Sequence, residues 1–182
     1  KNYLSHVLEV EGVNVVTGKE VDAAFAHEEK PDVVIVSTGS KRPGLAASGS
    51  SATPVIGVTD SLSAEIGNNV VAVLGFNAQT VDTAHYLTAQ GKKVTIVSDE
   101  PEEAFGTGQS MMLDKFVEPV FLAAGGSVRS ESKLKSVGDG EVVLTTSFGV
   151  DITVPCYCVV DASNMVAGTS LADELSGDFD VV

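Results

Sequence analysis

The sequence predicts an α/β fold built on a central parallel sheet. Short, fully apolar runs at residues 69–74, 93–97 and 158–161 are of the kind that parallel strands show when both of their faces are buried. A helix-length segment separates the first two runs, and a glycine directly follows the first. A chain of 182 residues with 43% hydrophobic content can bury one full domain and part of another.

The first lobe of the chain is predicted to be short and mixed. We expect a helix over residues 3–9, a strand over 13–16 and a second helix over 20–29. A β-branched run at 33–36 predicts a strand buried on both faces. The stretch 41–63 is rich in Gly, Ser, Ala and Pro without a sustained period, and is interpreted as a connection between two lobes.

A strand–helix–strand unit opens the second lobe. The strand at 69–74 runs into Gly75, a helix is predicted over 79–90, and the next strand covers 93–97. One helix face carries apolar side chains at Val81, Ala84 and Leu87, and Gly91 is placed to end the helix. Such a unit has parallel strands and a right-handed crossover.

The following region changes from helix to short strands. A helical stretch is expected over 109–124, interrupted by Pro119, before a strand around Val128. Alternating segments separated by Asp139-Gly140 and Phe148-Gly149 then predict a β-meander, with strands at 133–137, 141–146 and 151–154. The meander stands where a plain doubly wound fold would place another crossover helix, and the apolar strand 158–161 follows it.

Charge and hydropathy exclude two classes of partner. Eleven basic against 25 acidic side chains give a net charge of −14, which repels nucleic-acid backbones and anionic membrane surfaces. No apolar stretch approaches the roughly 20 residues that span a bilayer, so we expect a soluble protein. Because Lys1 begins the chain without Met or a leader pattern, we expect a piece of a longer polypeptide.

The cysteines indicate a reducing compartment. Cys156 and Cys158 are two residues apart in a Val-rich strand, so alternation predicts that both point to one face, in a geometry unsuited to a disulfide. Two sulfurs close no zinc site, and no redox Cys-x-x-Cys is present. We expect buried structural thiols and a cytoplasmic location.

Two segments carry a resemblance to a known family. Residues 30–40, KPDVVIVSTGS, resemble the family segment where the chain leaves a flavin-side domain. A second segment consists of residues 66–75, IGNNVVAVLG, and continues into residues 83–87, TAHYL. It resembles the strand, glycine loop and helix of the family. The family is that of the NADH:flavin oxidoreductases typified by 2,4-dienoyl-CoA reductase, trimethylamine dehydrogenase and 2-enoate reductase, with a fold like the pyridine nucleotide-disulfide oxidoreductases.

The resemblance implies a Rossmann-like FAD/NAD(P)-binding fold with a β-meander crossover and part of a flanking FAD-type domain. Residues 1–54 would be the partial FAD-type domain and linker, 55–176 the NAD(P)-binding-type domain, and 177–182 the start of the return to the FAD-type domain. In such proteins, FAD, FMN and an iron–sulfur cluster belong to further domains. The chain is therefore expected to be catalytically incomplete alone, with those flavin and barrel domains as its partners.

The resemblance also places a phosphate-binding loop. The family pattern Gly-x-Gly-x-x-Gly aligns with Gly75, Asn77 and Thr80, so only the first glycine is kept. The amides of Ala78, Gln79 and Thr80 at the start of the helix would hold the pyrophosphate of a dinucleotide. Asn77 tolerates unusual backbone angles and could offer its amide near the phosphate, whereas Thr80 adds bulk against the sheet. Weak NAD binding and loss of binding both remain open.

An acid about 20 residues on would accept from the adenosine ribose hydroxyls. Ser98 occupies the usual position, so Asp99 would serve from the next one. With no arginine in residues 98–107, NADH is favoured over NADPH. The alternative is that Asp99, Glu100, Glu102 and Glu103 form a solvated acidic loop.

Other candidates are weaker. His6, His27 and His85 are interpreted as surface or boundary residues, since they show no metal or triad spacing. Ser37-Thr38-Gly39 resembles a segment that passes near a flavin, and residues 106–108 are either a second phosphate loop or a flexible connection.

Two functions follow from these features. The first is a nucleotide-binding region of a flavoprotein oxidoreductase that places NADH for hydride transfer to a flavin on absent domains. The second is a degenerate, non-catalytic module with a structural, subunit-contact or adenine-nucleotide-binding role.

Overall fold

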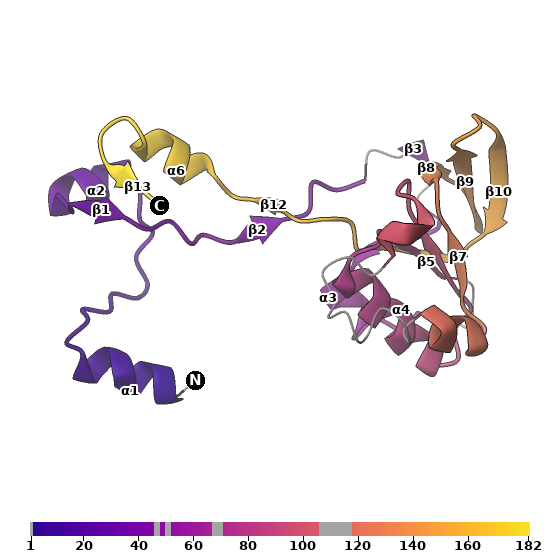
Figure 1. The fold of residues 1–182 in the computed structure, drawn as a ribbon, viewed down its shortest axis with the longest axis horizontal. Helices are drawn as coiled ribbons and strands as arrows, with labels where there is room; N and C mark the ends of the chain where they lie inside the picture. The colour runs from indigo at the N-terminus through magenta and orange to yellow at the C-terminus, as the bar shows by residue number, and fades with distance from the viewer. Residues whose placement is uncertain (1, 46–47, 50–51, 67–70, 106–117) are drawn as a thin grey trace. The chain divides into compact units, whose positions relative to one another are not determined.

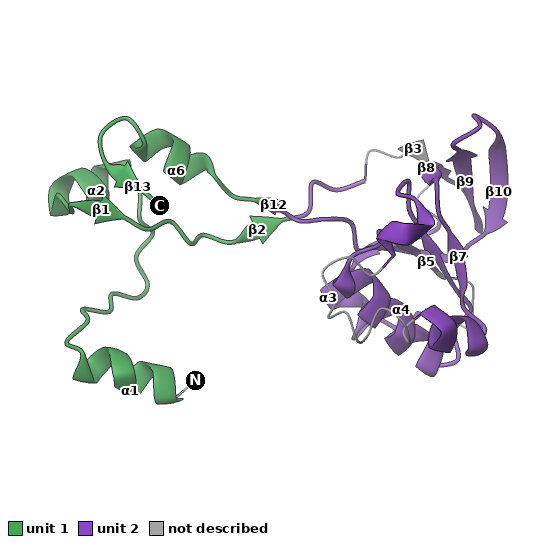
Figure 2. Cartoon of the chain, viewed as in Figure 1, with its two compact units in different colours: residues 1–41, 167–182 green, residues 42–166 purple. Residues whose placement is uncertain are grey.

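The computed structural model describes residues 2–45, 48–49, 52–66, 71–105 and 118–182. The chain forms two compact units: residues 1–41 with 167–182, and residues 42–166 (Figure 2). The assignment of residues 1–54 and 177–182 to a FAD-type domain stays a prediction.

A five-stranded parallel sheet forms the centre of the second unit (Figure 1). Its strands, in order across the sheet, are β4 (Val55–Gly57), β11 (Cys158–Asp161), β5 (Val71–Leu74), β6 (Val94–Val97) and β7 (Ser127–Arg129). All four pairings are parallel. The predicted fold class and its β5–α4–β6 unit are confirmed, with β11 inserted beside β5.

Helices cover one face of this sheet. Helix α4 (Ala78–Ala89) buries the predicted face of Val81, Ala84 and Leu87. Residues 118–123 are also helical, and their Phe121 is fully buried in the same apolar cluster as Val73, Ile96 and Val160. Gly126 leaves the space for that ring, because a Cβ there would lie 2.2 Å from Phe121. The predicted helix over 109–117 lies outside the described residues.

The predicted meander covers the other face. Strands β8 (Ser132–Val137), β9 (Glu141–Thr146) and β10 (Asp151–Pro155) pair antiparallel, and β3 (Ser48–Gly49) adds to β8 in parallel. Gly140 and Gly149 in the two connecting turns have φ of 79° and 75°, which suits glycine. Leu74, Val97, Val142, Leu144 and Val159 form the second apolar cluster, between the two sheets. Three layers result, and the parallel sheet is the middle one.

The linker expected over residues 41–63 is more ordered than predicted. It contains β3, β4 and the short helix α3 (Val58–Ser61), and a 3-10 turn, η1 (Glu102–Ala104), follows β6. Thr53 helps to fix this segment: its hydroxyl donates to the Gly138 carbonyl at 2.6 Å and accepts from the Gly140 N–H at 2.9 Å. Because these hydrogen-bond partners lie 85 and 87 residues away in the sequence, no local periodicity predicts the order of this segment.

The first unit is small. Its helices are α1 (Asn2–Val10), α2 (Ala23–Glu29) and α6 (Ser170–Leu175), and its strands are β1 (Val33–Val34), parallel to β13 (Asp180–Val181), and β2 (Ser40–Lys41), which pairs with β12 (Val166–Ala167). The predicted helices over 3–9 and 20–29 are confirmed in the main. Asp22 caps α2 by accepting from the Phe25 N–H at 2.9 Å.

Two strand predictions in this unit are wrong. Residues 13–16 form no strand, and β1 covers only the first half of the run 33–36. Val33 is 46% exposed and Ile35 77% exposed, although burial on both faces was expected. Val34 and Val36 are only half-buried, and within the described part of the chain β1 pairs with β13 alone in a two-stranded sheet, so this apolar run is not a strand buried on both faces.

The cysteine prediction is half right. Both thiols are free and buried, but Cys158 belongs to the apolar cluster under the helices and Cys156 to the cluster between the sheets. Alternation fails here because β10 ends at Pro155 and β11 begins at Cys158, so the two residues do not share a strand. Burial raises the pKa of both thiols, and that of Cys158 reaches about 11.

No helix within the described ranges is both long and apolar enough to cross a bilayer.

Candidate functional site

A pocket of about 570 Å³ lies at the carboxyl edge of β5 and β6. Five short segments line it: residues 43–45, Leu74–Gly75, 97–100, 132–134 and 163–164. Ligands of doubly wound α/β folds bind at this edge of the sheet. The pocket therefore brings the predicted Gly75 together with Ser98 and Asp99, although Gly75 lies 23 residues before Ser98 in the sequence.

Gly75 is required by its geometry. Its φ is 119°, and a Cβ would lie 2.8 Å from both the Ala162 carbonyl oxygen and the Thr80 hydroxyl. Its N–H donates to the Val97 carbonyl at 2.9 Å, which continues the β5–β6 pairing into the turn. The tight turn expected of the first glycine in the loop is therefore present.

Asn77 is the N-cap of α4. Its Oδ1 accepts from the Thr80 N–H at 3.1 Å, while its Nδ2 donates to the Ala162 carbonyl at 2.8 Å and to Asn164 Oδ1 at 2.9 Å. Its φ of −76° is ordinary, so the tolerance of asparagine for unusual backbone angles is not used here. The amide group ties the helix start to the end of β11 instead.

Thr80 is fully buried between α4 and the sheet. Its hydroxyl donates to the Ala162 carbonyl at 3.2 Å and lies 3.3 Å from Asn77 Oδ1. The bulk that the third loop position gains over glycine is thus accommodated by a local hydrogen-bond network. We call Gly75, Asn77 and Thr80 the glycine-loop half of the site.

Arg42 lies beside this half. Its Nε donates to the Ser163 carbonyl at 3.1 Å, and its guanidinium also donates to Gln79 Oε1. The contact brings a positive charge to the first turn of α4, where Ala78 and Gln79 lie. Sequence reasoning missed Arg42 because it is 37 residues from Gln79 and inside the predicted linker.

The opposite half of the site is acidic. Asp99 is exposed, whereas Ser98 is buried and its Oγ accepts from the Glu100 N–H at 3.1 Å. Ser98 therefore shapes the turn, and the carboxylates of Asp99 and Glu100 are the acids that line the pocket. We call residues 98–100 the acidic half of the site.

Lys133 is the second basic residue that sequence reasoning missed. It opens the meander, is exposed and lines the same pocket as Asp99. Lys92 and Lys93 lie at the opposite end of β6, directly before Val94. Both line a separate pocket with Gly91 and Gly125, and Lys92 Nζ donates to the Ile66 carbonyl.

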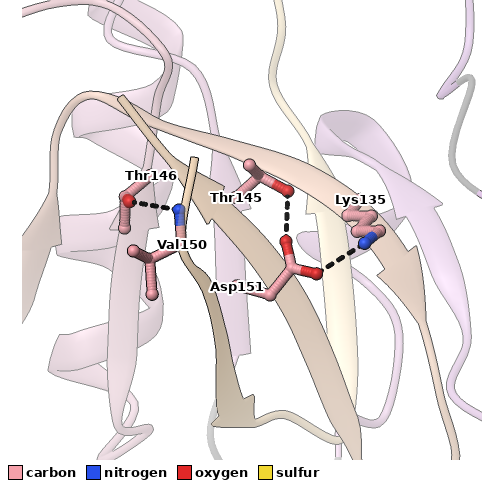
Figure 3. A network of polar contacts seen from close by, with 5 residues as sticks. All are labelled: Lys135, Thr145, Thr146, Val150 and Asp151. Atoms are coloured by element: carbon pink, nitrogen blue, oxygen red, sulfur yellow. Dashed lines mark hydrogen bonds and ion pairs between the residues drawn. The ribbon is translucent and has the colours of Figure 1, made fainter. Parts of the chain in front are cut away.

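Polar networks outside the pocket are structural. On the meander, Asp151 accepts from Lys135 at 2.5 Å and from the Thr145 hydroxyl at 2.7 Å (Figure 3). These hydrogen bonds lower the pKa of Asp151, with the Lys135 bond as the larger cause. Nearby, Thr146 accepts from the Val150 N–H at 3.2 Å and shapes the hairpin turn.

The histidines take the surface and boundary positions predicted for them. His6 and His27 are exposed and His85 is half-buried. His27 Nε2 lies 3.4 Å from Asp178. Among the residues that the structure describes, no three His, Cys, Asp or Glu side chains gather as metal ligands would. Residues 106–108 lie outside the described ranges.

The chain is similar in sequence to part of a known oxidase. No protein-family model matches the chain. It is 30% identical over 139 residues to an NADH oxidase of Thermoanaerobacter brockii, a match that covers 72% of this chain and 21% of that protein. The chain thus spans about a fifth of the length of this curated relative.

Solved structures agree in fold. A 2-naphthoyl-CoA reductase, in complex with 2-naphthoyl-CoA, superposes with a TM-score of 0.75 at 23% identity over 98% of this chain and 27% of its own. The histamine dehydrogenase of Rhizobium sp. 4-9 superposes with a TM-score of 0.68 at 17% identity, over 87% of this chain and 26% of its own. A HOCl-induced flavoprotein disulfide reductase of Escherichia coli superposes with a TM-score of 0.58 at 17% identity, over 75% of this chain and 31% of its own.

The fold is a Rossmann-like FAD/NAD-binding architecture. As the two motif segments predicted, the chain is similar in sequence and in fold to a part of flavin-dependent oxidoreductases.

Proposed function

We propose that the pocket at the carboxyl edge of β5 and β6 binds NADH and places it for hydride transfer to a flavin on domains outside this chain. The observation that carries the proposal is that Gly75 and Asp99 line one pocket, and that α4 begins three residues after Gly75. A dinucleotide needs these three features: a close backbone approach, a helix N-terminus for the pyrophosphate and an acid for the ribose.

Each part of the cofactor has a candidate partner. The pyrophosphate would lie over Gly75, near the amides of Ala78 and Gln79 and the guanidinium of Arg42. Asp99 would accept hydrogen bonds from the adenosine ribose, in the role that an acid at the end of the second strand has in such folds. Hydride transfer is the chemistry of the cofactors, and this chain supplies binding and orientation.

The acidic half also supports a preference between cofactors. A carboxylate at the ribose repels a 2′-phosphate, so NADPH is expected to bind more weakly than NADH by about 1 to 3 kcal/mol. Side-by-side titrations of the two cofactors check this, and equal or tighter NADPH binding would refute the placement of Asp99 at the ribose.

Isothermal titration calorimetry with NADH on the 182-residue chain tests the proposal. We expect saturable heat with a Kd for NADH in the micromolar to low millimolar range. In a matched titration, the Gln79→Ala variant should bind NADH no more tightly than the wild type. The absence of heat at millimolar NADH would count against physiological binding here.

A second candidate function rests on a specific observation. The positions of the two lost glycines are filled by side chains that bond one another and Ala162, as expected of a module kept for packing, subunit contact or adenine-nucleotide binding without hydride transfer. The double variant Asn77→Gly/Thr80→Gly separates the two functions. Affinity for NADH that appears only in this variant supports the degenerate module, whereas wild-type affinity supports the flavoprotein function.

A further inference from the structure

One lysine and two carboxylates meet at the acidic half of the pocket. Asp99 and Glu100 extend from the end of β6, and Lys133 comes from the start of β8. All three line the pocket, and Asp99 and Lys133 are exposed. The ribose end of the proposed cofactor would therefore meet charges of both signs.

Backbone hydrogen bonds hold these charges in one unit. The Ser98 N–H donates to the Arg129 carbonyl at 3.0 Å, and the Ser98 carbonyl accepts from the Ser132 N–H at 2.8 Å. The Glu100 carbonyl accepts from the Glu131 N–H at 2.9 Å. Because Lys133 directly follows Ser132, its backbone position is set by the segment that carries Asp99.

The turn between β7 and β8 supports this placement. Glu131 has a φ of 47°, which is uncommon for a residue with a side chain, and its carbonyl accepts from the Ser147 N–H at 2.9 Å. Contacts on both sides of the turn thus hold Glu131, and the start of β8 with it. The position of Lys133 relative to the end of β6 follows from the fold.

The two lysines of β8 differ in their partners. Lys135 is engaged with Asp151 at 2.5 Å on the meander. Within the described ranges, Lys133 forms no ion pair closer than 4.0 Å, and it faces the pocket. An ammonium group there can donate to a ligand oxygen without first breaking an ion pair seen in the structure.

We propose that Lys133 is a specificity-determining residue for the 2′ position of the adenosine ribose. This inference rests on the proposed nucleotide-binding function of the same pocket. Asp99 accepts from the free 2′-hydroxyl and disfavours a 2′-phosphate, whereas the ammonium of Lys133 attracts that phosphate. Lys133 therefore limits the discrimination that Asp99 creates.

The test separates the 2′ position from the rest of the cofactor. Adenosine 2′,5′-bisphosphate and 5′-AMP differ only by the 2′-phosphate, so the ratio of their Kd values reports on that group. In Lys133→Met we expect adenosine 2′,5′-bisphosphate to bind about three- to tenfold more weakly, with 5′-AMP changed by less than about twofold. The extra loss should shrink at 1 M salt, where screening is strong.

Lys93→Met is the matched control, because it removes the same charge from the opposite end of β6. Its Kd ratio should equal that of the wild type. An unchanged ratio in Lys133→Met, or an equal change in Lys93→Met, overturns the role of Lys133 while nucleotide binding still stands. If neither the adenosine nucleotides nor NADH binds the wild-type chain, the proposed function fails and this inference fails with it.

Discussion

The two halves of the candidate site are built in opposite ways. In the glycine-loop half, Gly75, Asn77 and Thr80 are packed or hydrogen-bonded to one another and to Ala162, so their side-chain contacts serve the fold. In the acidic half, Asp99 is an exposed side chain on a fixed backbone, and Lys133, which lines the same pocket, is exposed as well. Changes in the first half should therefore alter stability, and changes in the second should alter ligand affinity.

Gly75→Ala should have the largest effect. The new Cβ would meet the Ala162 carbonyl and Thr80 Oγ1 at 2.8 Å, at a φ of 119°. We expect a loss of about 3 to 4 kcal/mol in the free energy of unfolding, measured by urea denaturation.

Gly149→Ala is the control for that change. Its φ of 75° is also positive, but nothing lies within 4 Å of its Cβ, so only the backbone term of about 1 kcal/mol should appear. Equal losses in the two variants would show that the close contacts of Gly75 do not matter.

The buried thiol of Cys158, at the start of the neighbouring strand β11, should make stability sensitive to alkaline pH. The pKa of Cys158 is raised to about 11 in the fold, mainly by burial and secondarily by the nearby Cys156 thiol. A raised folded pKa gives stability that is complete below the unfolded value near 9 and is lost as pH rises towards 11. Over that window the wild type should lose on the order of 2 kcal/mol.

Cys158→Ala isolates the contribution of this thiol, because other groups titrate in both proteins. The variant should lose less stability than the wild type between pH 9 and 11 in parallel denaturant titrations. Identical pH profiles would contradict the burial of the Cys158 thiol.

Asn77→Ala should cost less than Gly75→Ala. It removes the N-cap acceptor of α4 and the donor to the Ala162 carbonyl, for a loss of about 1 to 2 kcal/mol in unfolding free energy. Thermal and urea unfolding measure it. An unchanged free energy of unfolding would mean that the hydrogen bonds of Asn77 in the glycine-loop half do not stabilise the fold.

Asp99→Asn should leave the fold almost unchanged, with less than about 0.5 kcal/mol of destabilisation, because its side chain is exposed. Its effect belongs to ligand binding: NADH affinity should fall and the NADPH-to-NADH preference should rise by roughly tenfold. Stability loss without a change in preference would remove the distinction between the halves.

The smallest effect is expected outside the site, at Asp151. Its folded pKa is lowered by the hydrogen bonds from Lys135 and Thr145, so its contribution is present above the unfolded pKa and is lost as pH falls through the folded value (Figure 3). Asp151→Asn should flatten the decline in stability below about pH 4. If the free energy of unfolding of the variant declines below about pH 4 as it does in the wild type, the contact of Asp151 with Lys135 does not contribute to stability in solution.

Local patterns predicted most of the second unit. The strands β5 and β6, the buried face of α4 and the hairpin glycines follow from periodicity and turn chemistry over a few residues. The prediction of a strand buried on both faces at residues 33–36 failed, because such burial depends on neighbouring layers that the strand's own sequence does not specify. The prediction for Cys156 failed because this residue lies between the end of β10 and the start of β11, where strand alternation does not apply.

The site was predicted only in outline. Gly75 and Asp99 were found because their spacing from the strand ends is local. Lys133 reaches the same pocket through the topology of the meander, and Arg42 reaches the first turn of α4 through a tertiary contact; no motif encodes either position. The engagement of Asn77 with Ala162 depends on the insertion of β11 beside β5, 85 residues away in the sequence.

Backbone amide shifts during an NADH titration, followed by NMR, test the central claim most directly. The account predicts saturable shifts at Gly75, Asp99 and Lys133, with little change at Lys93 and Gly125 on the opposite edge of the sheet. Shifts confined to that opposite edge, or none at millimolar NADH, would contradict the placement of a nucleotide in this pocket.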